Sequence, residues 1–162
     1  MTTDENETGW SNPGLETTYR EARTVLEAQN SVLGDIDTKA LQTVRLNVVL
    51  IGIVIAAAEI VGPEVFADGW LTLGILALLG SVFLGMITYS ESDSYLGPNK
   101  EYITQLVYDE FDDTSWDRDL VETYAEWIDL NSDIVRWNGS LLEGAQGLLL
   151  VGLILILLSI AF

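Results

Sequence analysis

The sequence predicts an all-α membrane protein with three transmembrane helices and a cytoplasmic helical stem formed by extensions of the first and third spans. Three apolar runs, at residues 46–62, 70–89 and 145–162, are each close to the length of about 20 residues that a helix needs to cross a bilayer. Two amphipathic stripes of helical period lead into the first and the third run without a proline. Together these features predict a membrane helical bundle.

The N-terminal part divides into a tail and a helix. Residues 1–13 are polar and acidic and are expected to be disordered, and the Asn-Pro-Gly sequence at 12–14 is typical of a helix start. A cytoplasmic helix is predicted over residues 14–45. The positions that recur every three or four residues and mark one face of it are Leu15, Tyr19, Ala22, Leu26, Gln29, Leu33, Ile36 and Ala40.

The first predicted span, residues 46–62, is apolar except for Asn47 and Glu59 and ends before Pro63. Residues 63–69 then form a short loop. Residues 70–89 carry no formal charge and begin and end with the aromatic residues that favour the level of the lipid headgroups. The third run, 145–162, is equally apolar. Buried core helices of a soluble protein are the alternative, which is disfavoured because so short a chain has too little amphipathic material to cover them.

The charged residues predict the orientation in the membrane. The loop at 63–69 contains no basic residue, because all seven lie before the first span or between the second and third. The positive-inside rule therefore places the N-terminus and residues 90–144 in the cytoplasm and the loop and C-terminus outside. The predicted localisation is the cell membrane, as a multi-pass protein, with the lipid bilayer as its first partner.

Residues 90–144 are predicted to form an acidic helical region. A short amphipathic helix is expected over 99–111, followed by a turn and a longer helix that runs into the third span. Because the stripe of this longer helix should face the stripe of residues 14–45, we expect the two to pack as a stem. The residues assigned to this packing are Leu26, Leu33, Tyr124, Trp127 and Ile134.

The composition excludes several classes of function. With 25 acidic against 7 basic residues and a net charge of −18, the chain lacks the clustered Lys and Arg that nucleic-acid binding requires. Such an excess of carboxylates is tolerated where concentrated salt screens their repulsion, which predicts a halophilic, archaeal source. Cysteine and histidine are absent, which removes thiol nucleophiles, disulfides, imidazole acid–base chemistry and the usual zinc sites. We therefore predict no enzymatic activity, no cofactor and no metal.

Two polar residues inside the first span are candidates for a functional role. Glu59 is an acid within a nominal span, where a buried charge is costly, but it lies close to the outer end. A solvated interfacial residue is therefore favoured over a proton or ion ligand. Asn47 can hydrogen-bond to a neighbouring helix, and this structural role is favoured over substrate binding.

Pairs of small residues spaced by four permit close approach of helices. They are Gly52 with Ala56 in the first span and Ser81 with Gly85 in the second. Packing within the bundle is the expected role of both pairs, and self-association of the chain is the alternative.

Two further clusters lie outside the spans. The acid-rich segment 109–119 could hold a divalent cation, but it lacks the glycine and the spacing of a calcium loop, so a solvated acidic surface is favoured. The aromatic residues Trp116, Tyr124, Trp127 and Trp137 lie on or beside the helical stripe. Core packing or headgroup anchoring is favoured for them over a ligand cage.

The segment Asp37–Ala40 reads Asp-Thr-Lys-Ala in the helix that leads into the first span, and an acidic helix with Trp and Tyr, Tyr124–Asn138, precedes the terminal apolar helix. In this order of elements the chain resembles the small multi-pass membrane effectors of prokaryotic nucleotide-signalled antiphage defence, the Pycsar transmembrane effector type. The resemblance covers residues 15–162 in layout and implies a cyclic-nucleotide-gated oligomer that disrupts the membrane. No nucleotide-binding motif is recognisable, so the gating ligand stays unassigned.

Two functions of different classes remain open. The first is a non-enzymatic, self-associating membrane protein whose cytoplasmic stem receives a signal to which the spans respond, with a membrane-acting defence effector as the form that the resemblance implies. The second is an accessory subunit of a larger membrane complex. Their expected partners are a homo-oligomer and a different membrane protein, respectively. A transporter or channel acting as a single chain is disfavoured, because three spans with one peripheral acid offer no substrate pathway.

Overall fold

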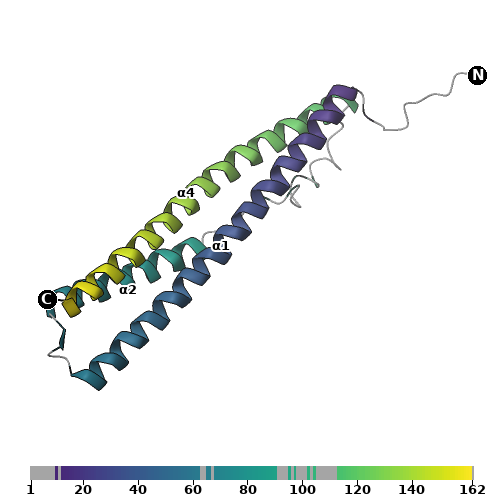
Figure 1. The fold of residues 1–162 in the computed structure, drawn as a ribbon. Coiled ribbons are helices and arrows are strands. Elements are labelled where there is room, and N and C mark those ends of the chain that lie inside the picture. Colours follow the sequence, from purple (N-terminus) through teal and green to yellow (C-terminus); the bar gives the residue numbers. More distant parts are fainter. Residues whose placement is uncertain are drawn as a thin grey trace, which may run out of the picture. The chain divides into compact units, whose positions relative to one another are not determined.

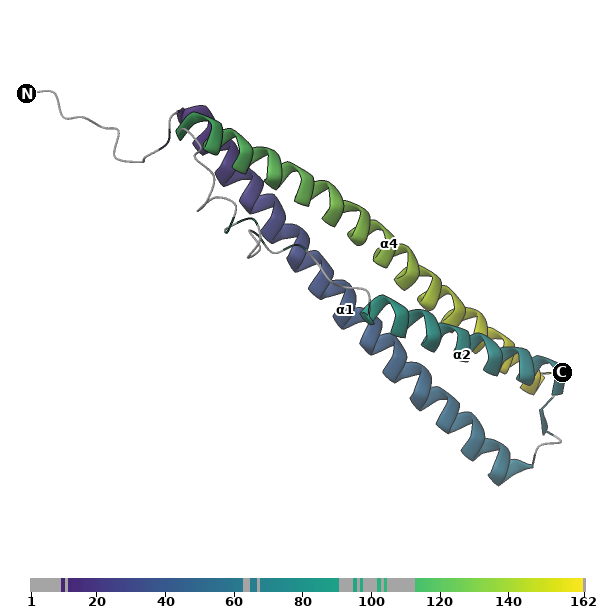
Figure 2. The same cartoon turned by 180° about the vertical axis from the view of Figure 1, so that it is seen from behind.

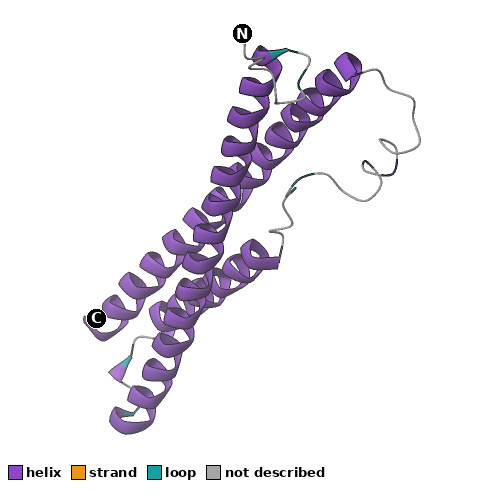
Figure 3. Ribbon diagram, turned by 90° about the vertical axis from the view of Figure 1, so that its right-hand side faces the viewer, coloured by secondary structure: helices purple, strands orange, loops and turns teal. Residues whose placement is uncertain are grey.

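The computed structural model describes residues 10, 12–62, 65–66, 68–90, 95, 97, 102, 104 and 113–161, without the side chains of residues 68, 113 and 114. Its elements are α1 (Pro13–Val61), α2 (Asp68–Ser90) and α4 (Asp113–Ala161) (Figure 1). No strand occurs in the part of the chain that is described (Figure 3). The predicted all-α class is therefore confirmed, and all three helices are long and apolar enough to cross a membrane. Most of the predicted helix at 99–111 and most of the tail at 1–13 lie outside the described residues.

Local chemistry sets both ends of α1. Asn12 accepts a hydrogen bond at Oδ1 from the backbone N–H of Gly14, at 2.7 Å, and Pro13 occupies the first helical position, where its missing N–H costs nothing. At the other end Gly62 adopts a φ of 89°, a left-handed conformation that glycine takes without strain. α1 therefore ends at Val61, and α2 begins six residues after Gly62, within the segment 63–69 that was predicted as a loop.

The chain divides into two compact units, and α1 and α4 each contribute a segment to both. Unit 1 comprises residues 1–31 and 94–133, and unit 2 comprises residues 32–93 and 134–162. α2 belongs wholly to unit 2. The polar halves of α1 and α4 form unit 1, and their apolar halves join α2 in unit 2.

Unit 1 is packed through large side chains. Leu26 of α1 is buried against Leu120, Tyr124 and Trp127 of α4. The ring of Tyr19 meets the ring of Tyr124 edge to face, with centroids 5.2 Å apart, and Tyr124 lies 5.1 Å from Trp127. Aromatic pairs in this geometry add stability beyond the area that they bury. Aromatic side chains thus form the core of unit 1.

Unit 2 is packed through a seam that combines small and polar side chains with leucine and isoleucine. The buried positions of each helix recur at spacings that alternate between three and four, which is the pattern of a left-handed helical bundle. These seam positions are Leu33, Ile36, Ala40, Thr43 and Asn47 in α1; Gly74, Leu78, Ser81, Gly85 and Thr88 in α2; and Asn138, Leu142, Ala145, Leu149, Gly152, Ile156 and Ser159 in α4.

α2 and α4 run side by side (Figure 2), and their backbones lie close together at a pair of glycines. A Cβ atom on Gly152 would lie 2.7 Å from Cδ2 of Leu78 and 3.0 Å from the backbone oxygen of Gly74. A Cβ atom on Gly74 would lie 3.1 Å from the backbone oxygen of Gly152. Only glycine fits at both positions without a shift of the backbone.

The apolar end of α1 is packed much less than α2 and α4. No residue from Val48 to Val61 is buried, and this end of α1 runs apart from the other two helices of unit 2 (Figures 1 and 2). In the most apolar 18-residue window of each helix, 6% of the residues are buried in α1, against 28% in α2 and 28% in α4. Unit 2 is therefore a tight α2–α4 pair, to which α1 is packed from Leu33 to Asn47 but not beyond.

Candidate functional site

A buried polar contact joins all three helices of unit 2. The side-chain amide of Asn47 in α1 donates from Nδ2 to Oγ of Ser81 in α2, at 2.8 Å, and to the backbone oxygen of Thr43, at 2.9 Å. The Ser81 hydroxyl donates in turn to the backbone oxygen of Ala145 in α4, at 2.6 Å. Asn47, Ser81 and Ala145 are all fully buried. The arrangement is that of interhelical polar contacts between membrane helices.

The seam also contains amide groups without a hydrogen-bond partner. Asn47 Oδ1 and both polar atoms of the Asn138 side chain are buried, and they have no partner among the described residues. One heptad earlier on α4, the amide of Asn131 is satisfied on both sides, because Nδ2 donates to Tyr95 O at 3.0 Å and Oδ1 accepts from Tyr95 N–H at 2.9 Å. Polar atoms buried without a partner lower stability, so Asn47 Oδ1 and the Asn138 amide are unfavourable at these positions within the single chain.

The two small-residue pairs of the spans have different surroundings. A Cβ atom on Gly85 would lie 2.8 Å from Cγ2 of Val44, and Ser81 takes part in the three-helix contact, so this pair packs within unit 2. A Cβ atom on Gly52 would meet nothing within 4 Å, and Ala56 is exposed. Gly52 and Ala56 therefore lie on an open face of α1.

Glu59 lies away from the polar contact. It is exposed and lines a shallow groove of about 430 Å³ between α1 and α2, together with apolar residues such as Ala58 and Leu71. No group of three acidic, histidine or cysteine side chains that could hold a metal occurs among the described residues. In the acid-rich segment, residues 109–112 lie outside the described part, and Asp119 Oδ2 accepts a hydrogen bond of 3.2 Å from the hydroxyl of Tyr102.

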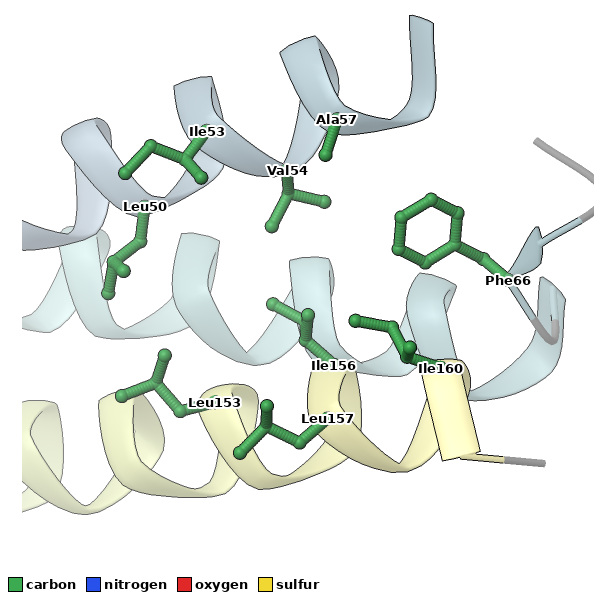
Figure 4. A pocket seen from close by; sticks show the side chains of 9 residues that line it. All are labelled: Leu50, Ile53, Val54, Ala57, Phe66, Leu153, Ile156, Leu157 and Ile160. Atoms are coloured by element: carbon green, nitrogen blue, oxygen red, sulfur yellow. The ribbon is translucent and has the colours of Figure 1, made fainter. Parts of the chain in front are cut away.

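A second groove, here called the α1–α4 groove, is entirely apolar (Figure 4). It has a volume of about 290 Å³ and lies between the two diverging helices. Its lining residues are Leu50, Ile53, Val54, Ala57, Phe66, Leu153, Ile156, Leu157 and Ile160. Sequence reasoning missed this groove, because lipid-facing and core-facing residues of a span are equally apolar.

The five residues assigned to stem packing do not form one cluster. Leu26, Tyr124 and Trp127 meet in the core of unit 1, whereas Leu33 is buried in unit 2 and Ile134 is half-buried there. These residues lie on stripes that repeat every three or four residues in the sequence. The spacing does not change where unit 1 meets unit 2 along each helix, so the sequence pattern does not reveal the two units.

Burial in unit 1 raises the pKa of two tyrosine side chains. Loss of solvent around the Tyr124 phenol raises its pKa to about 12, and a hydrogen bond with Tyr19 adds to the effect. Burial also raises the pKa of Tyr102 above its ordinary value. These phenols are therefore held in their neutral form, which suits a packed aromatic core better than acid–base chemistry near neutral pH.

Comparison with known proteins adds no relative to this description. No protein-family model, curated protein sequence or solved structure matches the chain. The resemblance of the Asp37–Ala40 segment to the antiphage effectors therefore stays a prediction.

Proposed function

We propose that the chain is a non-enzymatic integral membrane protein that self-associates in the bilayer through the open face of α1 and receives a signal through unit 1 in the cytoplasm. The observation that carries this proposal is the open small-residue face at Gly52 and Ala56, on the helix whose apolar window is only 6% buried.

The open face has the character of a helix-association surface. Gly52 and Ala56 lie one turn apart on α1, and the exposed side chains Val49 and Ile60 continue the same face at spacings of three and four. In lipid, helices associate where small residues allow close backbone contact, since lipid tails are as apolar as leucine. The corresponding pair in α2 already serves packing within the chain, whereas the pair in α1 is open.

Aromatic and charged residues support the proposed placement in the membrane. Trp70 and Tyr89, near the two ends of α2, are 43% and 53% exposed, as expected for side chains at the two headgroup levels. The absence of basic residues from 63–69 supports an N-terminus in the cytoplasm and a C-terminus outside. Unit 1 would then be cytoplasmic, where a high salt concentration screens its acidic surface.

The continuity of α1 and α4 supports the proposal that a signal received by unit 1 reaches unit 2. α1 and α4 each carry residues of both units without a break in the helix. A ligand that changes the packing of unit 1 would therefore act on the same two helices that enter unit 2. The specific form that we propose to test is a membrane-acting defence effector, with dye leakage from vesicles as its readout.

The decisive experiment is to purify the tagged chain from membranes at high salt and to measure the mass and composition of the particle. A homo-oligomer in the wild type, and a monomer when Gly52 and Ala56 are both changed to Ile, are expected. The control is Val65→Ile, at an exposed aliphatic position outside the face. A wild-type monomer would refute self-association, and a stoichiometric heterologous partner would establish an accessory subunit instead.

A further inference from the structure

The α1–α4 groove has a size that selects its occupant. Its walls, Leu50–Ala57 and Leu153–Ile160, each extend for about 12 Å at a rise of about 1.5 Å per residue. A volume of about 290 Å³ over about 12 Å corresponds to a mean cross-section of about 24 Å². An α-helix about 10 Å wide would need roughly 80 Å², whereas an alkyl chain about 4–5 Å across needs roughly 13–20 Å².

The chemistry of the walls points to the same occupant. All nine lining residues are aliphatic or aromatic, and apolar cavities of this kind do not hold water. The α4 wall is fixed, since Ile156 packs on Gly74 of α2, while the α1 wall has no buried residue beyond Asn47. At one end, the ring of Phe66 points into the space between the two helices (Figure 4). Both walls lie in helices that are apolar enough to cross a membrane.

We infer that the α1–α4 groove binds one alkyl chain of a membrane lipid. The chain lies along the groove between the aliphatic walls and fills a space that would otherwise be a void between two spans, which close-packed interiors avoid. The lipid thereby completes the packing that the end of α1 lacks within the chain. This inference rests on the proposed insertion in a bilayer but not on the proposed self-association.

The test uses photolabelling of the full chain in phosphatidylcholine vesicles that contain a phosphatidylcholine with a diazirine in one acyl chain. Leu157 lines the groove and is 65% exposed, and Leu150, one heptad earlier on α4 and 60% exposed, does not line it. The vesicles are then fused with an about tenfold excess of unlabelled phosphatidylcholine vesicles and irradiated before a bound lipid exchanges, so a resident chain should label Leu157 about tenfold more than Leu150, which contacts only the diluted bulk lipid. Equal labelling at the two positions would refute the site. Weaker labelling at Leu157 would also refute it and would indicate that protein covers the groove.

Two neighbouring alanines provide the matched variants. Ala57→Phe places a ring in the groove, and Ala56→Phe places the same ring on the open face of α1. Ala57→Phe should lower labelling at Leu157 to the level of Leu150 and leave the oligomer intact. Ala56→Phe should leave labelling unchanged and disrupt the oligomer. Undiminished labelling in Ala57→Phe would overturn the inference, and an intact oligomer in Ala56→Phe would count only against self-association.

A second variant that fills the α1–α4 groove keeps the test valid if the first variant does not fold. Leu153→Phe fills the groove from the opposite wall, and the helix content of each variant is compared with that of the wild type by circular dichroism. If Ala57→Phe does not fold, Leu153→Phe must show the same loss of labelling at Leu157. Full labelling in a folded Leu153→Phe variant would contradict the assignment.

Discussion

The two units of this chain use the same helices, α1 and α4, but pack them differently. In unit 1 the helices meet through large side chains, with Leu26 buried among Leu120, Tyr124 and Trp127. In unit 2 the backbones of Gly74 and Gly152 lie close together, and hydrogen bonds link Asn47 to Ser81 and Ser81 to Ala145.

This difference follows from the solvent that each unit is proposed to face. In water, burial of apolar area is the main driving force, so large aromatic side chains are effective. In lipid that driving force is absent between helices, so small residues, close backbone contact and interhelical hydrogen bonds take its place. Packing style along one continuous helix therefore indicates where the surroundings change, and mutations should have different effects in the two units.

The largest effect is expected from a charge in the core of unit 1. Leu26 is 2% exposed, and Leu26→Asp would bury an unpaired carboxylate at a cost of about 4 kcal/mol. Rapid proteolysis of unit 1 is expected, whereas Val25→Asp, at a position 43% exposed, should have little effect. Equal protease resistance of the two variants would show that unit 1 is not held by its aromatic core.

A smaller effect, of opposite sign at two sites, should come from adding one methyl group to glycines of α4. Gly152→Ala should destabilise unit 2 by about 2 kcal/mol, because the new Cβ meets Leu78 and the backbone of Gly74. Gly147→Ala, where nothing lies within 4 Å, should stabilise the helix by up to about 1 kcal/mol. Thermal unfolding in detergent measures both, and a similar shift in both variants would argue against close α2–α4 contact.

The hydrogen bonds between Asn47, Ser81 and Ala145 should contribute less to the stability of unit 2 than the glycine contacts do. Asn47→Ala removes the hydrogen bond to Ser81, and Ser81→Ala removes both hydrogen bonds that Ser81 makes to the other helices, at an expected cost of about 1 kcal/mol for each bond. The double variant should show a coupling of about 0.6 kcal/mol, which is typical of hydrogen bonds between membrane helices. Strict additivity would mean that the two side chains do not interact.

The smallest effect on stability is expected from the ionisation of Tyr124 in unit 1, which occurs only at high pH. Because the pKa of Tyr124 is raised from 10.0 to about 12, the unfolded chain loses this proton at lower pH than the folded chain. The stability that the folded state gains from keeping the Tyr124 phenol protonated is fully present below pH 10 and is lost as pH rises towards about 12. Helix content measured against pH should fall in this window, and the fall should be smaller in Tyr124→Phe. An unchanged profile would assign the fall to other groups.

Much of the fold could be predicted from the sequence, because long apolar runs and helical periodicity are local signals. Asn47 could be named as a helix-contact residue, since a polar side chain in an apolar run needs a partner, but its bond to Ser81 depends on the register of two helices. The pairing of Gly74 with Gly152 depends on register in the same way. The division into units was not visible, because the stripe through Leu26 and Leu33 crosses it with an unchanged period.

The divergence of α1 was hidden for a different reason. The apolar ends of α1 and α4 are alike in composition, and in a span the residues that face lipid are as apolar as those that face protein. Hydropathy therefore identifies three spans but does not tell which two form the tight pair. That choice is made by shape, through the glycines shared by α2 and α4.

Disulfide cross-linking in membranes tests the central claim of self-association through α1 most directly. The chain contains no cysteine, so a single Ala56→Cys substitution creates a unique thiol on the open face, and Ala145→Cys places the matched control thiol in the buried seam. Mild oxidation should yield a covalent dimer from Ala56→Cys and none from Ala145→Cys. A chain that stays monomeric with Ala56→Cys, in membranes where both variants are inserted and folded, would contradict the claim.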